Sequence, residues 1–154
     1  MTDSRLNALS PLDGRYADKC ADLAALFSEG ALIARRLRVE AAWFKQLARS
    51  GRFPALAGLA AGVTARLESL EAGTDAAGLA RVKDIESRTN HDVKAVEYYL
   101  REELAAAGAK PPQLEFVHFG CTSEDINNLA YALMLAEARE RGNDLVDVHV
   151  RAGA

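Results

Sequence analysis

Apolar residues recur at helical spacing along most of this chain, and that spacing restricts its fold more than any other feature. Between residues 56 and 70 the apolar positions advance by three and four, which places them on one face of a helix. Residues 33–47, 79–85 and 93–104 carry similar stripes. The mixed apolar segment at 115–121 has no partner strand elsewhere in the sequence. The chain therefore predicts an all-α fold, with helices packed as in a bundle.

Size and composition fit one soluble globular domain and exclude several classes of partner. The chain has 154 residues, of which 49% are hydrophobic and 27% charged, and its formal net charge is −3. That charge predicts no general attraction to nucleic acid or to an anionic membrane, so any site for an anion has to be local. No apolar run approaches the roughly 20 residues that span a bilayer. No nucleic acid or membrane is expected as a partner.

The compartment is inferred from the N-terminus and the cysteines. Residues 1–5 lack a basic segment followed by an apolar one, so we expect no secretory signal. Cys20 and Cys121 are far apart and have no paired spacing, which favours reduced thiols over a disulfide or a metal site. The predicted localisation is the cytoplasm.

The segment Thr122-Ser123-Glu124-Asp125-Ile126-Asn127-Asn128 has the chemistry of a helix start. Thr122 and Asp125 match an N-cap with its partner three residues later, with Asp in place of the usual Glu or Gln. A helix start presents free backbone N–H groups, which can bind a phosphate or a carboxylate. Two asparagines in succession favour hydrogen bonding across an interface or a pocket, because asparagine is a mediocre helix former.

A second helix start is predicted at Thr89-Asn90-His91-Asp92, with Asn90 as its N-cap. His91 adds an imidazole that can face an anion or pass a proton. Taken alone, each of these residues reads first as a cap or as a surface side chain. An early Arg15-Tyr16 pair offers a guanidinium fork for phosphate or carboxylate, although a solvated arginine is the simpler interpretation.

The sequence assigns a structural role to His118 and predicts no metal site. His118 lies between Val117 and Phe119, so we expect a hydrogen-bonded core histidine. No set of His, Cys and acidic residues has the spacing of metal ligands, and no metal site is predicted.

Three segments together resemble one known family. These are Ser10-Pro11-Leu12-Asp13-Gly14-Arg15-Tyr16, Arg88-Thr89-Asn90-His91-Asp92-Val93-Lys94-Ala95-Val96-Glu97-Tyr98, and Phe116-Val117-His118-Phe119-Gly120-Cys121-Thr122-Ser123-Glu124-Asp125-Ile126-Asn127-Asn128. In this order they resemble segments of the bacterial adenylosuccinate lyases, members of the fumarase and aspartase superfamily. The resemblance covers roughly residues 5 to 141.

The resemblance implies a fold, an assembly and a reaction. It implies a helical N-terminal domain over residues 1–121 and, over 122–141, the first helix leading into a central helical bundle. Residues 142–154, which begin at Gly142, are expected to form a divergent and poorly ordered tail. Relatives of this kind are homotetramers with shared active sites. They eliminate fumarate from adenylosuccinate to give AMP, and from the succinylated aminoimidazole carboxamide ribotide of purine biosynthesis, with no cofactor.

The resemblance also implies roles for particular residues. Arg15 and Tyr16 would hold the nucleotide end of the substrate. The trio Asn90, His91 and Asp92 would line the substrate, with His91 as an auxiliary acid. Thr122 and Ser123 would bind a succinyl carboxylate.

Two departures from the family pattern lead to further expectations. The histidine of a Thr-His-Gly-Gln segment and the serine of a mobile loop, which are the main acid and base of relatives, are absent from these residues. The chain alone is therefore expected to be inactive. Two alternatives stay open: another lyase of the superfamily, such as an argininosuccinate lyase, and a helical assembly module without catalysis.

Overall fold

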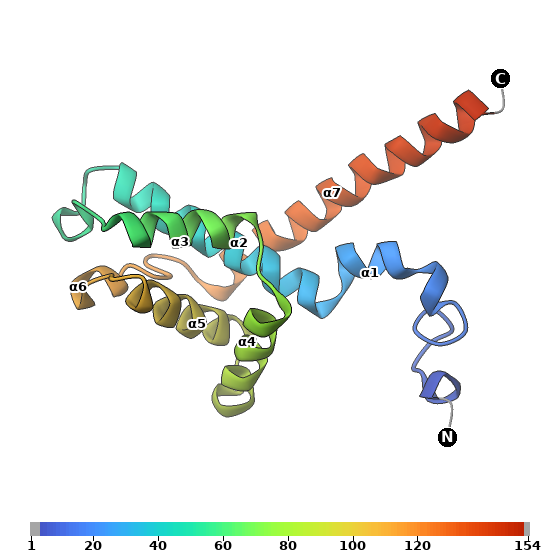
Figure 1. Cartoon of the computed structure of the whole chain (residues 1–154), viewed down its shortest axis with the longest axis horizontal. Coiled ribbons are helices and arrows are strands. Elements are labelled where there is room, and N and C mark those ends of the chain that lie inside the picture. The colour runs from blue at the N-terminus through green and yellow to red at the C-terminus, as the bar shows by residue number, and fades with distance from the viewer. Residues whose placement is uncertain (1–3, 153–154) are drawn as a thin grey trace.

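Every regular element in the described part of the chain is a helix, which confirms the all-α prediction (Figure 1). The computed structural model describes the backbone of residues 4–152 and the side chains of residues 6–142. The 3-10 helices are η1 (Ser4–Asn7), η2 (Ala17–Lys19) and η3 (Pro54–Leu56). The α-helices are α1 (Ala21–Phe27), α2 (Glu29–Arg49), α3 (Ala61–Ala72), α4 (Ala76–Thr89), α5 (Asp92–Ala106), α6 (Pro111–Leu114) and α7 (Ser123–Ala152).

Helix α2 is the centre of the core, because it packs against α3, α4, α5 and α7. Ser28 caps its start, because the Ser28 side chain accepts a hydrogen bond from the Ala31 amide at 3.2 Å. Leu37 and Phe44 on α2 are fully buried. The predicted stripes of α3 and α5 meet them, with Leu67 and Leu100 also fully buried. Each such side chain contributes about 1.5–3 kcal/mol of apolar burial.

Helix α7 is longer than the sequence predicted. It runs from Ser123 to Ala152, so the expected interruption at Gly142 is wrong. A glycine inside a helix costs only about 1 kcal/mol relative to alanine, and each added residue of an established helix gains a hydrogen bond. Residues 142–152 of the predicted tail are therefore helical, and residues 153–154 lie outside the described part. In Figure 1 α7 extends away from the other helices.

The N-terminal arm, residues 4–20, consists of turns and 3-10 helix. Asp13 closes one turn by accepting hydrogen bonds from the Ser10 amide at 2.8 Å and hydroxyl at 2.9 Å. The arm leads into α1, and Figure 1 shows it well apart from α4 and α5. None of the described helices combines the length and apolar character needed to cross a membrane.

Candidate functional site

The junction between α4 and α5 differs by one residue from the prediction. Asn90 has a left-handed backbone, with φ of 50°, and ends α4 through a hydrogen bond from its amide to the Glu86 carbonyl at 2.8 Å. Asparagine tolerates this conformation better than most residues. His91 is therefore the N-cap of α5, and its Nδ1 accepts a hydrogen bond from the Lys94 amide at 3.2 Å. The prediction of Asn90 as the cap is wrong.

Asp92 is held at both carboxylate oxygens. Its Oδ1 accepts a hydrogen bond from the Val93 amide at 2.8 Å, and its Oδ2 forms an ion pair with Arg36 Nη2 at 2.6 Å. Partial burial alone would raise the pKa of the Asp92 carboxyl. The Val93 amide and the Arg36 guanidinium outweigh that effect and hold the pKa below its ordinary value. Asp92 is therefore a stable anion at neutral pH.

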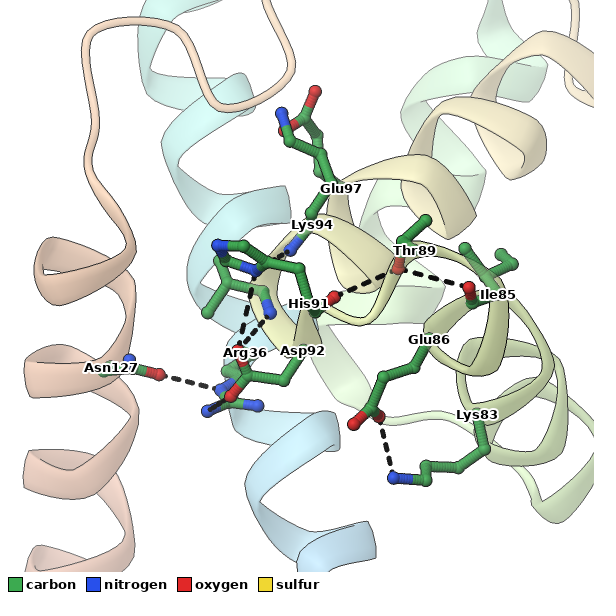
Figure 2. A network of polar contacts seen from close by, with 11 residues as sticks. Arg36, Lys83, Ile85, Glu86, Thr89, His91, Asp92, Lys94, Glu97 and Asn127 are labelled. Atoms are coloured by element: carbon green, nitrogen blue, oxygen red, sulfur yellow. Dashed lines mark hydrogen bonds and ion pairs between the residues drawn. The ribbon is translucent and has the colours of Figure 1, made fainter.

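Arg36 joins three helices at this point (Figure 2). Its guanidinium belongs to α2, and the residue is 6% exposed. Besides the ion pair with Asp92 at the start of α5, Nε donates a hydrogen bond to Asn127 Oδ1 of α7 at 2.9 Å. A planar guanidinium suits such two-partner binding. The contact confirms that Asn127 bonds across an interface, whereas Asn128 is exposed.

Sequence reasoning missed both Arg36 and Glu40, although a signal for them existed. Both charged residues fall on the buried stripe of α2, at the spacing of Ile33, Leu37 and Phe44. A charge in such a position has to find a partner inside the fold, because an unpaired buried charge is costly. The pattern thus marks Arg36 and Glu40 as members of buried polar networks.

The start of α7 has the predicted reciprocal cap. The Thr122 amide and hydroxyl donate to Asp125 Oδ2 at 2.7 and 2.9 Å, and the Asp125 amide donates back to Thr122 Oγ1 at 3.4 Å. The two donors of Thr122 lower the pKa of the Asp125 carboxyl. Ser123 is the first helical residue and lies one turn before Asn127. Residues four apart share one helix face, so Ser123 lies on the side of α7 that Arg36 contacts.

The loop before α7 is held by a second buried charge. His118 has a left-handed backbone, with φ of 60°, and its Nδ1 lies 2.5 Å from Glu40 Oε1. This agrees with the predicted hydrogen-bonded histidine. The contact with Glu40 raises the pKa of the His118 imidazole. Glu40 is 1% exposed, and its Oε2 has no hydrogen-bond partner among the described residues. Trp43 Nε1 holds the same loop by donating to the Phe119 carbonyl at 2.9 Å.

Arg15 and Tyr16 lie on the N-terminal arm and not beside the other candidate residues. Both are exposed, and the Arg15 guanidinium lies 5.4 Å from the centre of the Tyr16 ring. Figure 1 shows the arm apart from the start of α5. Within this chain Arg36 links Asp92, at the start of α5, to Asn127, one turn after Ser123 on α7, whereas Arg15 and Tyr16 lie on the separate arm.

An apolar cavity of about 790 Å³ lies next to this region, between α2 and α7. Its lining includes Trp43, Cys121, Ile126, Leu129 and Leu133. It is adjacent to the start of α7 but does not include Thr122 or Ser123. Among the described side chains, no group of three or more His, Cys, Asp or Glu residues is arranged to hold a metal ion.

Known proteins resemble this chain over most of its length. A family model described as "Lyase" matches residues 14–147. An adenylosuccinate lyase from Haemophilus influenzae is 47% identical over 137 residues, and one from Escherichia coli K12 is 46% identical over 137 residues. These matches cover 89% of the chain. One from Legionella pneumophila is 45% identical over 138 residues, or 90% of the chain.

The match spans only part of those relatives. The chain covers 30% of the length of each of the three proteins. The family model nevertheless matches far more than half of the present chain, and the similarity includes all the segments that form the two helix starts. The chain belongs to this lyase family.

Proposed function

We propose that this chain builds part of the active site of an adenylosuccinate lyase, which eliminates fumarate from adenylosuccinate to leave AMP. The same site would act on the succinylated aminoimidazole carboxamide ribotide of purine biosynthesis. The names of the similar proteins support the substrate. The observation that carries the proposal is the Arg36 link, because it ties Asp92, which follows His91 at the start of α5, to Asn127, one turn after Ser123 on α7.

The start of α7 would bind one carboxylate of the succinyl group. The Ser123 hydroxyl and the amides of Ser123 and Glu124 are suited to this, because the first amides of a helix lack partners within the helix. Elimination begins when a base removes a proton from the carbon next to a carboxylate. Negative charge then builds on that carboxylate, and fixed donors that face it lower the barrier. Thr122 holds these donors in place through its cap with Asp125.

Arg15 and Tyr16 would act across a subunit boundary. Both are exposed on an arm that lies apart from His91 within one chain. In a homotetramer with shared sites, the arm of one subunit would reach the site of another and hold the nucleotide phosphate. A guanidinium suits this role, because its planar fork can bind two phosphate oxygens at once.

The main acid and base would come from other segments of the complete lyase, so we expect no turnover from these residues alone. No cofactor enters this proposal, because proton removal and leaving-group protonation need only side chains. A cytoplasmic location fits the two cysteines, Cys20 and Cys121, which are both free.

A chimera tests this function. Residues 14–147 of this chain would replace the matching N-terminal 30% of the Escherichia coli relative. Conversion of adenylosuccinate to AMP and fumarate is then followed by absorbance. We expect turnover within about tenfold of the parent enzyme and a loss of at least about a hundredfold on Ser123→Ala. A folded tetrameric chimera that is inactive on adenylosuccinate but active on argininosuccinate would overturn the assignment.

A further inference from the structure

The loop that precedes α7 contains a backbone turn that has to be held in place. His118 has a left-handed backbone, with φ of 60°, which only a few per cent of residues other than glycine adopt. Such a conformation is costly and persists only where the surrounding structure holds it. The His118 carbonyl accepts a hydrogen bond from the Cys121 amide at 3.2 Å, and Thr122, the cap of α7, follows directly. The direction in which α7 begins therefore depends on how His118 is held.

Two side chains of α2 hold this turn. Glu40 Oε1 lies 2.5 Å from Nδ1 of the His118 ring. Trp43, three residues further along α2, donates its Nε1–H to the Phe119 carbonyl at 2.9 Å. Residues three apart on a helix are neighbours on its surface. One face of α2 thus binds two successive residues of the loop.

Stability alone does not explain a carboxyl group at position 40. Glu40 is 1% exposed and lies on the buried stripe of α2 with Leu37 and Phe44. Its Oε2 is buried and has no hydrogen-bond partner among the described residues. A half-satisfied polar group in a core is less favourable than an apolar side chain of similar volume, and replacing buried charged pairs by apolar residues is often neutral or stabilising. What Glu40 adds is the geometry that it imposes on His118.

That geometry reaches the anion-binding donors of α7. The cap between Thr122 and Asp125 fixes the first helical turn internally, whereas the contact of Glu40 with His118 fixes where that turn lies relative to α2. Arg36 lies one helical turn before Glu40 on α2 and binds Asp92 at the start of α5. Both helix starts are therefore placed by the same stretch of α2. Donors stabilise a developing charge only when they are already oriented toward it.

We propose that Glu40 is a positioning residue of this site: through its hydrogen bond to His118 it orients the donors of Ser123 and Glu124 toward the substrate carboxylate. Glu40 itself does not touch the substrate in this assignment. The inference deepens the function proposed above and rests on it for the identity of the carboxylate.

The first test measures the turn in the full 154-residue chain. Glu40→Gln keeps the shape of the side chain and a hydrogen bond to the ring, whereas Glu40→Leu keeps neither polar atom. At positive φ the His118 amide proton and Hα give a strong nuclear Overhauser effect, which we expect in the original chain and in the glutamine variant. In the leucine variant it should weaken, and exchange of the Cys121 amide with water should be about tenfold faster.

Two outcomes of this test would overturn the proposal. An intact turn in Glu40→Leu would show that Glu40 does not hold it. A turn lost equally in Glu40→Gln and Glu40→Leu would show that the hydrogen bond is not what holds it. The urea midpoint of Glu40→Leu should stay close to that of the original chain, because the His118 side chain is partly exposed and can release its proton when Glu40 is absent.

The second test separates positioning from stability in the chimera. Glu40→Leu should lower kcat on adenylosuccinate by at least about tenfold with KM changed less than about threefold, and Glu40→Gln should restore most of kcat. Ile33→Val is the matched control, since Ile33 is buried on α2 two turns before Glu40. It should lower the denaturation midpoint more than Glu40→Leu does and leave kcat unchanged. Equal kcat in Glu40→Leu and Ile33→Val would overturn the positioning role.

Failure of this inference and failure of the proposed function give different results. A folded chimera without lyase activity, combined with a turn that loosens in Glu40→Leu, would refute the function and its substrate carboxylate while the hold on the turn stands. An active chimera in which Glu40→Leu loosens the turn without lowering kcat would refute only the positioning role of Glu40.

Discussion

The two helix starts of the candidate site are built differently. At α5 the first-turn amides of Val93 and Lys94 are bound by Asp92 and His91, and a buried guanidinium holds the junction. At α7 the cap uses Thr122 and Asp125 on the exposed surface and leaves the amides of Ser123 and Glu124 for a ligand. The α5 start is closed by its own side chains, whereas the α7 start is open. We infer that the first supplies rigid geometry and the second supplies the anion contacts.

The largest effect should follow from removing the link between the two starts. Arg36→Met keeps much of the side-chain volume but leaves Asp92 and Asn127 without their shared partner. Because the guanidinium is buried, we expect the free energy of unfolding to fall by about 2–3 kcal/mol. Arg66→Met is the matched control, since Arg66 is partly exposed and pairs with Glu103, and it should cost less than about 1 kcal/mol. Equal losses in urea denaturation would show that Arg36 is an ordinary surface charge.

A smaller effect should separate the two adjacent asparagines of α7. Asn127→Ala leaves the buried Nε of Arg36 without an acceptor, which costs about 1–2 kcal/mol before a small gain in helix propensity. Asn128→Ala removes an exposed side chain and should be neutral or slightly stabilising. Thermal unfolding of both variants checks the difference. A larger loss of stability in Asn128→Ala than in Asn127→Ala would show that Asn127 is not the asparagine that binds Arg36.

At the start of α7, one variant should lower mainly stability and its neighbour should lower mainly activity. Thr122→Ala removes the N-cap and should lower the free energy of unfolding by about 1 kcal/mol. Ser123→Ala should change stability by less than about 0.5 kcal/mol, because Ser123 is outside the reciprocal cap. In the chimera, Ser123→Ala should still cause the larger loss of activity. If Ser123→Ala proves the more destabilising of the two, its proposed role in binding loses support.

The smallest effect concerns how the stability of the chain depends on pH, through Asp92 at the start of α5 and through His118 in the loop before α7. The folded pKa of Asp92 is lowered, so its contribution to stability is present above the unfolded value of about 3.9 and is lost as the pH falls through the folded value. The folded pKa of His118 is raised, so its contribution is present below about 6.5 and is lost as the pH rises through the folded value.

The corresponding variants should flatten opposite sides of the stability profile. Asp92→Asn should remove the acid-side dependence that belongs to the α5 start. His118→Gln should remove the dependence above neutral pH that belongs to the loop before α7. Denaturation midpoints measured from pH 3 to pH 9 provide the test. A His118→Gln profile that matches the original chain above pH 6.5 would show that the Glu40 contact does not form.

Local features were predictable from sequence because their partners are near in the chain. The Ser28 cap of α2 and the pairing of Thr122 with Asp125 each join residues three apart. The cap of α5 was misplaced by one residue, since Asn90 is suited both to starting a helix and to the left-handed end of one.

Features that depend on distant residues were not predictable in the same way. Arg36 meets Asp92 and Asn127 across separations of 56 and 91 residues, which no local pattern encodes. The helical continuation through Gly142 also escaped prediction, because one glycine is a weak stop signal inside a long helix. The family resemblance indicated Arg15 with the other site residues, yet nothing in the sequence of one chain shows whether a second subunit brings them together.

The contact on which the account depends can be observed directly by NMR. In the ¹⁵N- and ¹³C-labelled chain, the Arg36 Nε–H proton should give nuclear Overhauser effects to the β-protons of both Asp92 and Asn127, and its exchange with water should be slow. A rapidly exchanging Arg36 Nε–H signal with neither contact would contradict the claim that this guanidinium joins the two helix starts into one site.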